Sequence, residues 1–167
     1  LVSGGRYRPL TLVIFALLYQ VVGNSPFVFH LLTVLLFAFT SVVLYRTLLL
    51  LLEGWTTARG QAPLVAWIAT LLFAAHPIHT EVAANIKGCD EIITLLGSLG
   101  ALLFTVKYVD TRKVSWALAA AGAFFLACLS KENAATFVVV IPLALWFFRG
   151  VSPGQSIRHS IPVWAAF

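Results

Sequence analysis

Side chains that could do chemistry are concentrated in one short segment of this sequence, between two apolar stretches. Positions 76–91 hold two histidines, three carboxylates, an asparagine and a lysine. They are His76, His79, Glu81, Asn85, Lys87, Asp90 and Glu91. Imidazole and carboxylate groups serve as general bases, and together with an amide they hydrogen-bond polar ligands. Because ionisable residues in membrane segments usually mark working sites, this segment predicts a catalytic or binding site.

The spacing within the segment is compatible with more than one kind of site. If Pro77 begins a helix, His76 and His79 lie close together, and Glu81 and Asn85 share a face. Such a set binds a divalent metal only with a third ligand from elsewhere in the chain. It can equally bind a polar substrate or supply a general base, or it can cap a helix and satisfy backbone groups. We expect a substrate pocket, with both histidines and Glu81 as catalytic candidates.

Asp90 and Glu91 admit a catalytic and a structural interpretation. Either could act as a catalytic carboxylate, and Asp90 joins the catalytic candidates. Equally, Asp90 suits the N-cap of a helix and Glu91 its first turn, where negative charge is favourable.

A second polar motif, Ser130-Lys131-Glu132, follows another apolar stretch. Ser130 suits an N-cap and Glu132 a first helical turn. Lys131 is harder to explain, because a cation is unfavourable at a helix N-terminus. An anionic ligand would compensate for it, so Lys131 and Glu132 are substrate-binding candidates.

Arg6 and Arg8 are the candidates for binding a phosphate. Two arginines separated by one residue can bind a phosphate through several charged hydrogen bonds. The alternative is that both extend to the membrane interface without a ligand. His30, near one end of a long apolar span, together with Asn85 and Lys87, completes the set of substrate-binding candidates.

The composition excludes most soluble classes. The chain has 167 residues, of which 60% are hydrophobic and 10% charged, and its mean hydropathy is +0.96. A soluble domain of this length needs more polar surface to cover its core. The net charge of +5 is spread thinly and forms no basic run, which argues against a nucleic-acid partner. We expect an integral membrane protein that contacts membrane lipid.

The apolar pattern predicts an all-α, polytopic membrane helix bundle. Helices are expected near 9–22, 27–52, 63–75, 77–88, 91–108, 114–129 and 132–148, then a loop to residue 160 and another helix starting at 161. Several are too short for a hydrocarbon layer of about 30 Å. Each short helix meets a polar motif at the same end, which indicates polar groups recessed into the bilayer. Because the chain starts at Leu1, lacks methionine and ends in a nascent helix, we expect an incomplete fragment.

The basic residues predict the orientation in the membrane. One face would carry seven of them: Arg46, Arg59, Lys107, Arg112, Lys113, Arg149 and Arg158. The other would carry four: Arg6, Arg8, Lys87 and Lys131. The larger set belongs in the cytoplasm by the positive-inside rule. The polar site is therefore expected on the periplasmic or lumenal face.

Five motifs occur in an order that resembles a known family. They are Arg6-Tyr-Arg-Pro-Leu10, Ser25-Pro-Phe-Val-Phe-His30, His76-Pro-Ile-His-Thr-Glu81, Gly88-Cys-Asp90 and Ser130-Lys-Glu132. This set resembles the membrane domain of the transmembrane and tetratricopeptide-repeat O-mannosyltransferases and their bacterial relatives. The resemblance extends from Arg6 to about Phe148.

The resemblance implies a membrane glycosyltransferase of the GT-C type. Such an enzyme moves a sugar, which the family name implies is mannose, from a polyisoprenyl-phosphate donor to a protein or glycan acceptor on the exoplasmic face. The main catalytic acid of the family would lie upstream of residue 1, so the fragment is expected to be inactive alone. Apart from the divalent metal considered above for the histidine segment, the sequence indicates no cofactor.

Two departures from the family pattern bear on this expectation. Relatives often have an arginine where this chain has Cys89, and Lys87 would replace it only as a point charge. His30 is followed by Thr33 where relatives commonly have asparagine. The sequence Ala-Asn-Ile-Lys around Asn85 resembles that of bacterial members more than that of animal ones. We therefore expect a bacterial inner membrane, or the endoplasmic reticulum membrane if the protein is eukaryotic.

Two other functions are compatible with the same residues. A transporter or flippase would use the same polar groups as a substrate path, but it should show polar residues towards both faces or repeated broken helices. A non-catalytic membrane scaffold would retain the motifs without the chemistry, and Cys89 lends weight to it.

Overall fold

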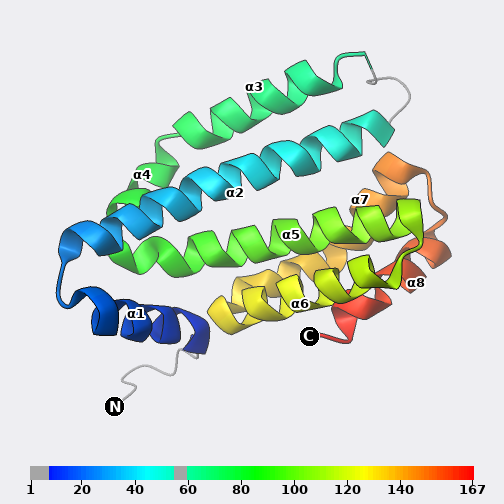
Figure 1. The fold of residues 1–167 in the computed structure, drawn as a ribbon. Helices are drawn as coiled ribbons and strands as arrows, with labels where there is room; N and C mark the ends of the chain where they lie inside the picture. The colour runs from blue at the N-terminus through cyan, green and yellow to red at the C-terminus, as the bar shows by residue number, and fades with distance from the viewer. Residues whose placement is uncertain (1–7, 55–59) are drawn as a thin grey trace.

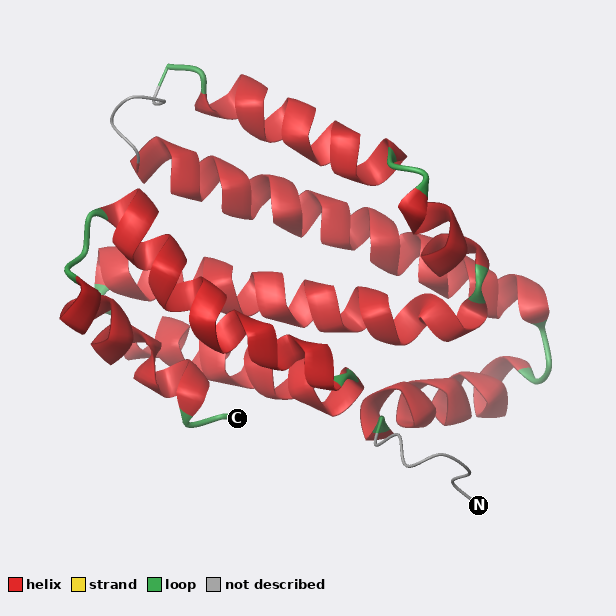
Figure 2. Cartoon of the chain, turned by 180° about the vertical axis from the view of Figure 1, so that it is seen from behind, coloured by secondary structure: helices red, strands yellow, loops and turns green. Residues whose placement is uncertain are grey.

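The computed structural model describes residues 8–54 and 60–167, and this part of the chain is an all-α bundle (Figure 1). The helices in chain order are α1 (Pro9–Val22), α2 (Pro26–Gly54), α3 (Ala62–Ala75), α4 (Ile78–Ala84), η1 (Ile86–Gly88), α5 (Cys89–Thr111), α6 (Val114–Ser130), η2 (Glu132–Thr136), α7 (Phe137–Arg149) and α8 (Pro153–Trp164). Figure 2 shows the same bundle from behind, with α1 and α8 at opposite ends.

Helix breaks coincide with proline and glycine. Proline occupies the first turn of α1, where its missing N–H is tolerated. Gly23 ends α1 with φ +66°, a conformation that L side chains rarely adopt, and α2 then starts at Pro26. The result is a sharp reversal that sets α1 beside the start of α2 (Figure 1).

The polar segment at 76–91 begins at a sharp bend. Pro77 disfavours helical backbone at His76, which is extended with φ −68° and ψ 128°. Helices α3 and α4 consequently meet at 65°. The bend turns α4 towards the start of α5, so the polar residues of α4 and α5 occupy one end of the bundle.

Helices α5 and α6 pack closely because small residues line their interface. A Cβ at Gly97 would lie 2.8 Å from the carbonyl oxygen of Ala123 and 2.9 Å from the Cβ of Ala127. Small residues permit this approach in membrane bundles, where packing replaces the hydrophobic effect between helices. Phe124 of α6 and Ile141 of α7 are among the fully buried residues of the core.

Buried threonines mark the inner face of α2. Thr33, Thr40 and Thr47 recur at every seventh position and are almost fully buried. Each hydroxyl donates to the carbonyl four residues earlier, at 2.8–3.1 Å. This internal bonding satisfies the hydroxyls without water. The periodicity therefore identifies the face of α2 that packs into the bundle.

The chain is a multi-pass membrane protein. Within the described residues, Pro26–Gly54, Ile86–Thr111 and Glu132–Arg149 are each long and apolar enough to cross a membrane. The bent pair α3–α4 would add a fourth span. Large apolar side chains on α1, α2, α3, α6 and α7 are exposed on the outside of the bundle, as lipid-facing residues should be.

Three expected helices differ from the structure by more than a few residues at their ends. The expected helix 77–88 is divided into α4 and η1, and 132–148 into η2 and α7. The last helix begins at Pro153 rather than at 161, within the expected loop. Its polar composition concealed it, because Ser156, His159 and Ser160 are buried against the bundle while the opposite side is exposed.

Candidate functional site

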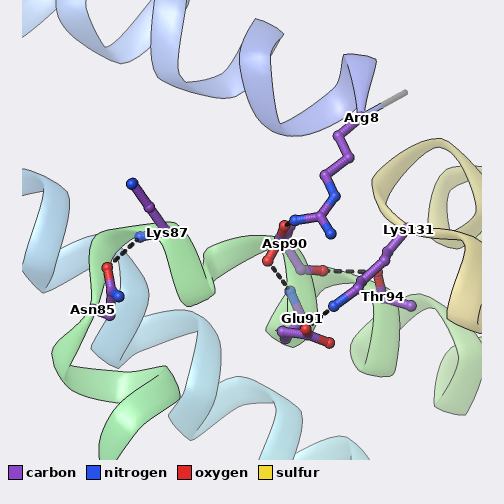
Figure 3. Close-up of polar contacts among 7 residues, drawn as sticks. All are labelled: Arg8, Asn85, Lys87, Asp90, Glu91, Thr94 and Lys131. Carbon is purple, nitrogen blue, oxygen red and sulfur yellow. Dashed lines mark hydrogen bonds and ion pairs between the residues drawn. The ribbon is translucent and has the colours of Figure 1, made fainter. Parts of the chain in front are cut away.

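Two ion pairs join three parts of the chain at the N-terminus of α5 (Figure 3). The guanidinium of Arg8, just before α1, donates to the carboxylate of Asp90. The ammonium of Lys131, between α6 and η2, donates to the carboxylate of Glu91. These contacts join segments that the distribution of basic residues assigns to the same face of the membrane.

The first turn of α5 presents both carboxylates side by side. Gly88 is its N-cap, so Asp90 lies inside the helix and is not the N-cap that the structural interpretation predicted. A Cβ at Gly88 would lie 2.3 Å from the Val82 carbonyl oxygen, so only glycine permits η1 to pack on α4. The backbone N–H of Glu91 donates to Asp90 Oδ1 at 2.8 Å. Two carboxylates here are also favoured by the positive end of the helix dipole.

Lys131 has a protein anion as its partner. Its backbone is extended, with φ −161° and ψ 146°, and separates α6 from η2. Ser130 belongs to the end of α6 and donates to the Leu126 carbonyl, so it is not an N-cap. The anion that the sequence requires near Lys131 is supplied by Glu91. A ligand phosphate would have to share or replace this contact.

Beside the ion pairs lies a pocket of about 390 Å³ between α2, α3, α4, α5 and η2–α7. Its polar lining includes His79, Glu91 and Asn133, and its aromatic lining includes Phe37 and Phe73. Polar hydrogen-bonding groups with aromatic walls suit a ligand that has both hydroxyl and C–H surfaces, such as a sugar.

One buried hydroxyl on the wall of this pocket lacks a partner. Ser98 Oγ is buried and makes no hydrogen bond within the described part of the chain. The neighbouring Thr94 hydroxyl, in contrast, donates to the Asp90 carbonyl at 2.7 Å. An unsatisfied buried hydroxyl is costly, so a ligand group in the pocket would be a favourable partner for Ser98.

The two histidines occupy different environments. His79 packs between Phe73, with ring centroids 4.3 Å apart, and Phe37, at 5.6 Å. His76 is exposed at the bend, its ring 6.1 Å from that of His79, and its Nδ1 accepts from the Ile78 N–H at 3.2 Å. His76 therefore stabilises the start of α4, as the structural interpretation expected, whereas His79 lines the pocket.

The remaining candidates lie apart from the ion pairs. Asn85 Oδ1 accepts from the Lys87 N–H at 3.1 Å, and Figure 3 shows both side chains at a distance from Asp90 and Lys131. His30, Glu81 and Glu132 are exposed and line none of the pocket. Arg6 lies outside the described residues. Within the described residues, no three His, Cys, Asp or Glu side chains come together in a way that could hold a metal ion.

An apolar groove of about 460 Å³ lies next to the Arg8–Asp90 pair, between α1, α2, α5 and α6. Leu10 and Ile93 line it one helical turn or less from Arg8 and Asp90 along the chain. Phe104 lines it further along α5. The groove thus presents an almost wholly hydrocarbon surface that leads away from the charged end.

Sequence reasoning missed most of the pocket wall. Phe37, Phe73 and Ser98 look like ordinary apolar or small helix residues, because only the fold shows that they surround His79. The threonine periodicity of α2 was the available signal, since Thr40 lines the same pocket. It indicates which face of α2 points inwards, and Phe37 lies one turn from Thr40 on that face.

Comparison with known proteins places these motifs in a family. The chain is 33% identical over 139 residues to the protein O-mannosyl-transferase TMTC3 of Homo sapiens, covering 81% of this chain and 14% of that protein. It is 36% identical over 146 residues to tmtc2 of Xenopus laevis (83% and 16%) and 30% identical over 143 residues to F38B6.6 of Caenorhabditis elegans (86% and 19%). The chain belongs to the TMTC family.

The expected family resemblance is thereby confirmed, as is the expectation of an all-α membrane bundle. The chain spans less than a fifth of the length of these TMTC relatives. No protein-family model matches the sequence, and no solved structure matches it.

Proposed function

We propose that this chain forms part of a membrane glycosyltransferase that moves mannose from a polyisoprenyl-phosphate donor to a protein acceptor. The observation that carries the proposal is the convergence of three features at one end of the bundle. Paired cations and carboxylates, a pocket with polar and aromatic walls, and an apolar groove adjoin one another there. The names of the TMTC relatives add support for mannose and for a protein acceptor.

Each feature suits one part of such a donor. The hydrocarbon tail fits the groove beside Leu10 and Ile93. The phosphate lies near Arg8 and Lys131, which stabilise the negative charge that develops on it as the sugar leaves. The sugar enters the pocket beside His79 and Asn133. Without a donor, Asp90 and Glu91 hold the two cations in place, so the phosphate meets charges that are already positioned.

The carboxylates can also take part in the acceptor chemistry. A hydroxyl acceptor must lose a proton as it attacks the sugar, and a carboxylate within hydrogen-bond reach can accept it. Glu91 lines the pocket, whereas Asp90 is buried against Arg8. Glu91 is therefore the better placed of the two for proton transfer, and Asp90 the better placed to position Arg8.

We place this end of the bundle on the exoplasmic side. In the described part of the chain, the charged end carries three cations, Arg8, Lys87 and Lys131. The other end carries six: Arg46, Lys107, Arg112, Lys113, Arg149 and Arg158. The positive-inside rule assigns the richer end to the cytoplasm. The site would then face the bacterial periplasm, or the lumen of the endoplasmic reticulum in a eukaryote.

A transfer assay tests the proposal. The natural full-length protein would be reconstituted in liposomes with radiolabelled mannosyl-phosphoryl-polyprenol and an acceptor protein. We expect label on the acceptor, and a fall of about a hundredfold in Lys131→Gln and Glu91→Gln, because each loses a charged contact at the reacting groups. Lys113→Gln removes a charge at the other end and should leave the rate unchanged. Equal rates in all four proteins would refute the proposal.

A further inference from the structure

A second polar pocket lies at the opposite end of α5 from the ion pairs. It has a volume of about 460 Å³ and lies between the end of α5 and α8. Its polar lining consists of Tyr108, Arg112, Gln155, Arg158 and His159. Because α5 has 23 residues, roughly 35 Å of helix separates the two sites. The second pocket is therefore independent of the site proposed for transfer.

The cationic charge of this pocket is not balanced by carboxylates. Neither Arg112 nor Arg158 forms an ion pair with a carboxylate in the described part of the chain, and residues 1–7 and 55–59 contain no Asp or Glu. The nearby Asp110 is instead paired with Arg149, at 2.8 Å. Two guanidinium groups at one pocket without an acid produce a local positive field that favours an anion.

His159 is held neutral at the inner wall of the pocket. Its Nε2 lies 3.0 Å from Arg112 Nη1. A guanidinium can only donate, so Nε2 must accept, and the ring carries its proton on Nδ1. Burial and then the charges of Arg112 and Arg158 lower the pKa of His159. Tyr108 packs edge-on against the ring, with centroids 5.8 Å apart. The histidine thus acts as a fixed acceptor that orients Arg112.

The backbone of Arg112 is also unusual. Its φ is +59°, and it is the one residue other than glycine with a positive φ in the described part of the chain. This conformation ends α5 through a 2.8 Å bond from the Arg112 N–H to the Tyr108 carbonyl. Glycine or asparagine is the usual residue at such a position. An arginine in this conformation has a strained backbone, and it places a guanidinium over α8. Such strain is concentrated at functional sites, including ligand-binding sites.

We propose that the pocket between α5 and α8 binds a phosphate group through Arg112 and Arg158. Arginine forks match phosphate oxygens in geometry and charge, and Tyr108 and Gln155 can add neutral hydrogen bonds. The phosphate can belong to an anionic phospholipid headgroup or to a small soluble molecule. With the orientation proposed above, the pocket opens at the cytoplasmic leaflet, where basic pockets between helices bind anionic headgroups.

Two probes distinguish the sources of the phosphate. The natural full-length protein would be titrated with phosphatidylglycerol in phosphatidylcholine nanodiscs, and bound lipid would be counted by native mass spectrometry. Inorganic phosphate would be titrated separately by calorimetry. We expect Arg112→Gln and Arg158→Gln to weaken binding of the recognised probe about tenfold, the size of one lost charged hydrogen bond. Lys113→Gln removes a neighbouring exposed charge that does not line the pocket, and it should change binding less than twofold.

The outcomes decide the proposal in both arms. Arginine-dependent binding of phosphatidylglycerol supports a lipid headgroup site, and arginine-dependent binding of inorganic phosphate supports a soluble ligand. Arg158 is exposed, so its variant should fold even if Arg112→Gln does not. The proposal is overturned if neither probe depends on the two arginines, or if Lys113→Gln weakens binding as much as they do.

Discussion

Arg8 and Asp90 are paired across 82 positions of the chain, and this contact ties α1 to the first turn of α5. Asp90 is 4% exposed, so its charge has little access to water. The pair therefore has two consequences. It fixes α1 against the bundle, and it places one cation beside the apolar groove. The first consequence can be measured without any substrate.

Removal of Arg8 should destabilise the protein more than loss of a surface charge. Arg8→Gln leaves the buried Asp90 carboxylate without its cation, which we expect to cost about 2–4 kcal/mol in the free energy of unfolding. Asp90→Asn in the same background should recover part of that loss, because it removes the stranded charge. Denaturant titration of the two single variants and the double variant would give the coupling. Additive effects would mean that the pair is not formed.

The close approach of α5 and α6 gives a prediction with a matched control. Gly97→Ala places a methyl group against the Ala123 carbonyl and Ala127, which belong to a helix backbone and cannot rotate away. Overpacking of this kind costs about 1–3 kcal/mol. Gly122→Ala adds the same methyl group where nothing lies within 4 Å, and it should stabilise α6 by about 0.5–1 kcal/mol. Thermal unfolding of both variants should therefore shift in opposite directions, and a parallel shift would contradict the packing described.

Stability should depend on pH through His159. Burial and two neighbouring arginines lower its pKa, so the folded protein binds fewer protons here than the unfolded chain does. The stabilisation is complete above the unfolded pKa of about 6.5 and is lost as the pH falls below it. His159→Gln cannot be protonated and should reduce this part of the pH dependence. Unfolding temperatures at pH 7.5 and pH 5 would check it, and an unchanged pH dependence in the variant would exclude His159 as the cause.

Ser98 separates a structural role from a ligand-binding one. Its hydroxyl is buried without a partner, so Ser98→Ala should leave stability unchanged or raise it by up to about 1 kcal/mol. If the hydroxyl binds the sugar, the same variant should raise KM for the donor several-fold. Thr105→Ala is a suitable control, because Thr105 is also buried on α5 but bonds to the Ala101 carbonyl and lies outside the pocket. An unchanged KM in Ser98→Ala would remove this hydroxyl from the site.

The sequence predicted the need for charged partners better than their identity. Lys131 required an anion on electrostatic grounds, but its partner Glu91 lies 40 residues away on another helix. Local rules could not select it, since Glu91 already had an adequate role in the first turn of α5. The same limit explains why His76 and His79 were treated together, although only the fold shows that His79 alone faces the pocket.

The helix boundaries show a similar division. Proline and glycine marked the breaks at Gly23 and Pro77, because their backbone constraints act locally. The start of α8 was placed at 161 instead of Pro153, because the stability of its first turns comes from packing against α6 and α7, and its buried side chains there are serine and histidine rather than leucine. The pocket wall was missed for the same reason. Residues such as Phe73 acquire their role from neighbours on other helices.

Binding of the lipid-linked donor is the most direct test of the central claim that the paired end of α5 receives a phosphate. Radiolabelled mannosyl-phosphoryl-polyprenol would be titrated into the full-length protein in nanodiscs. The account predicts saturable binding that weakens about tenfold in Lys131→Gln and is unchanged in Lys113→Gln. Equal affinity in the wild type and both variants would contradict it.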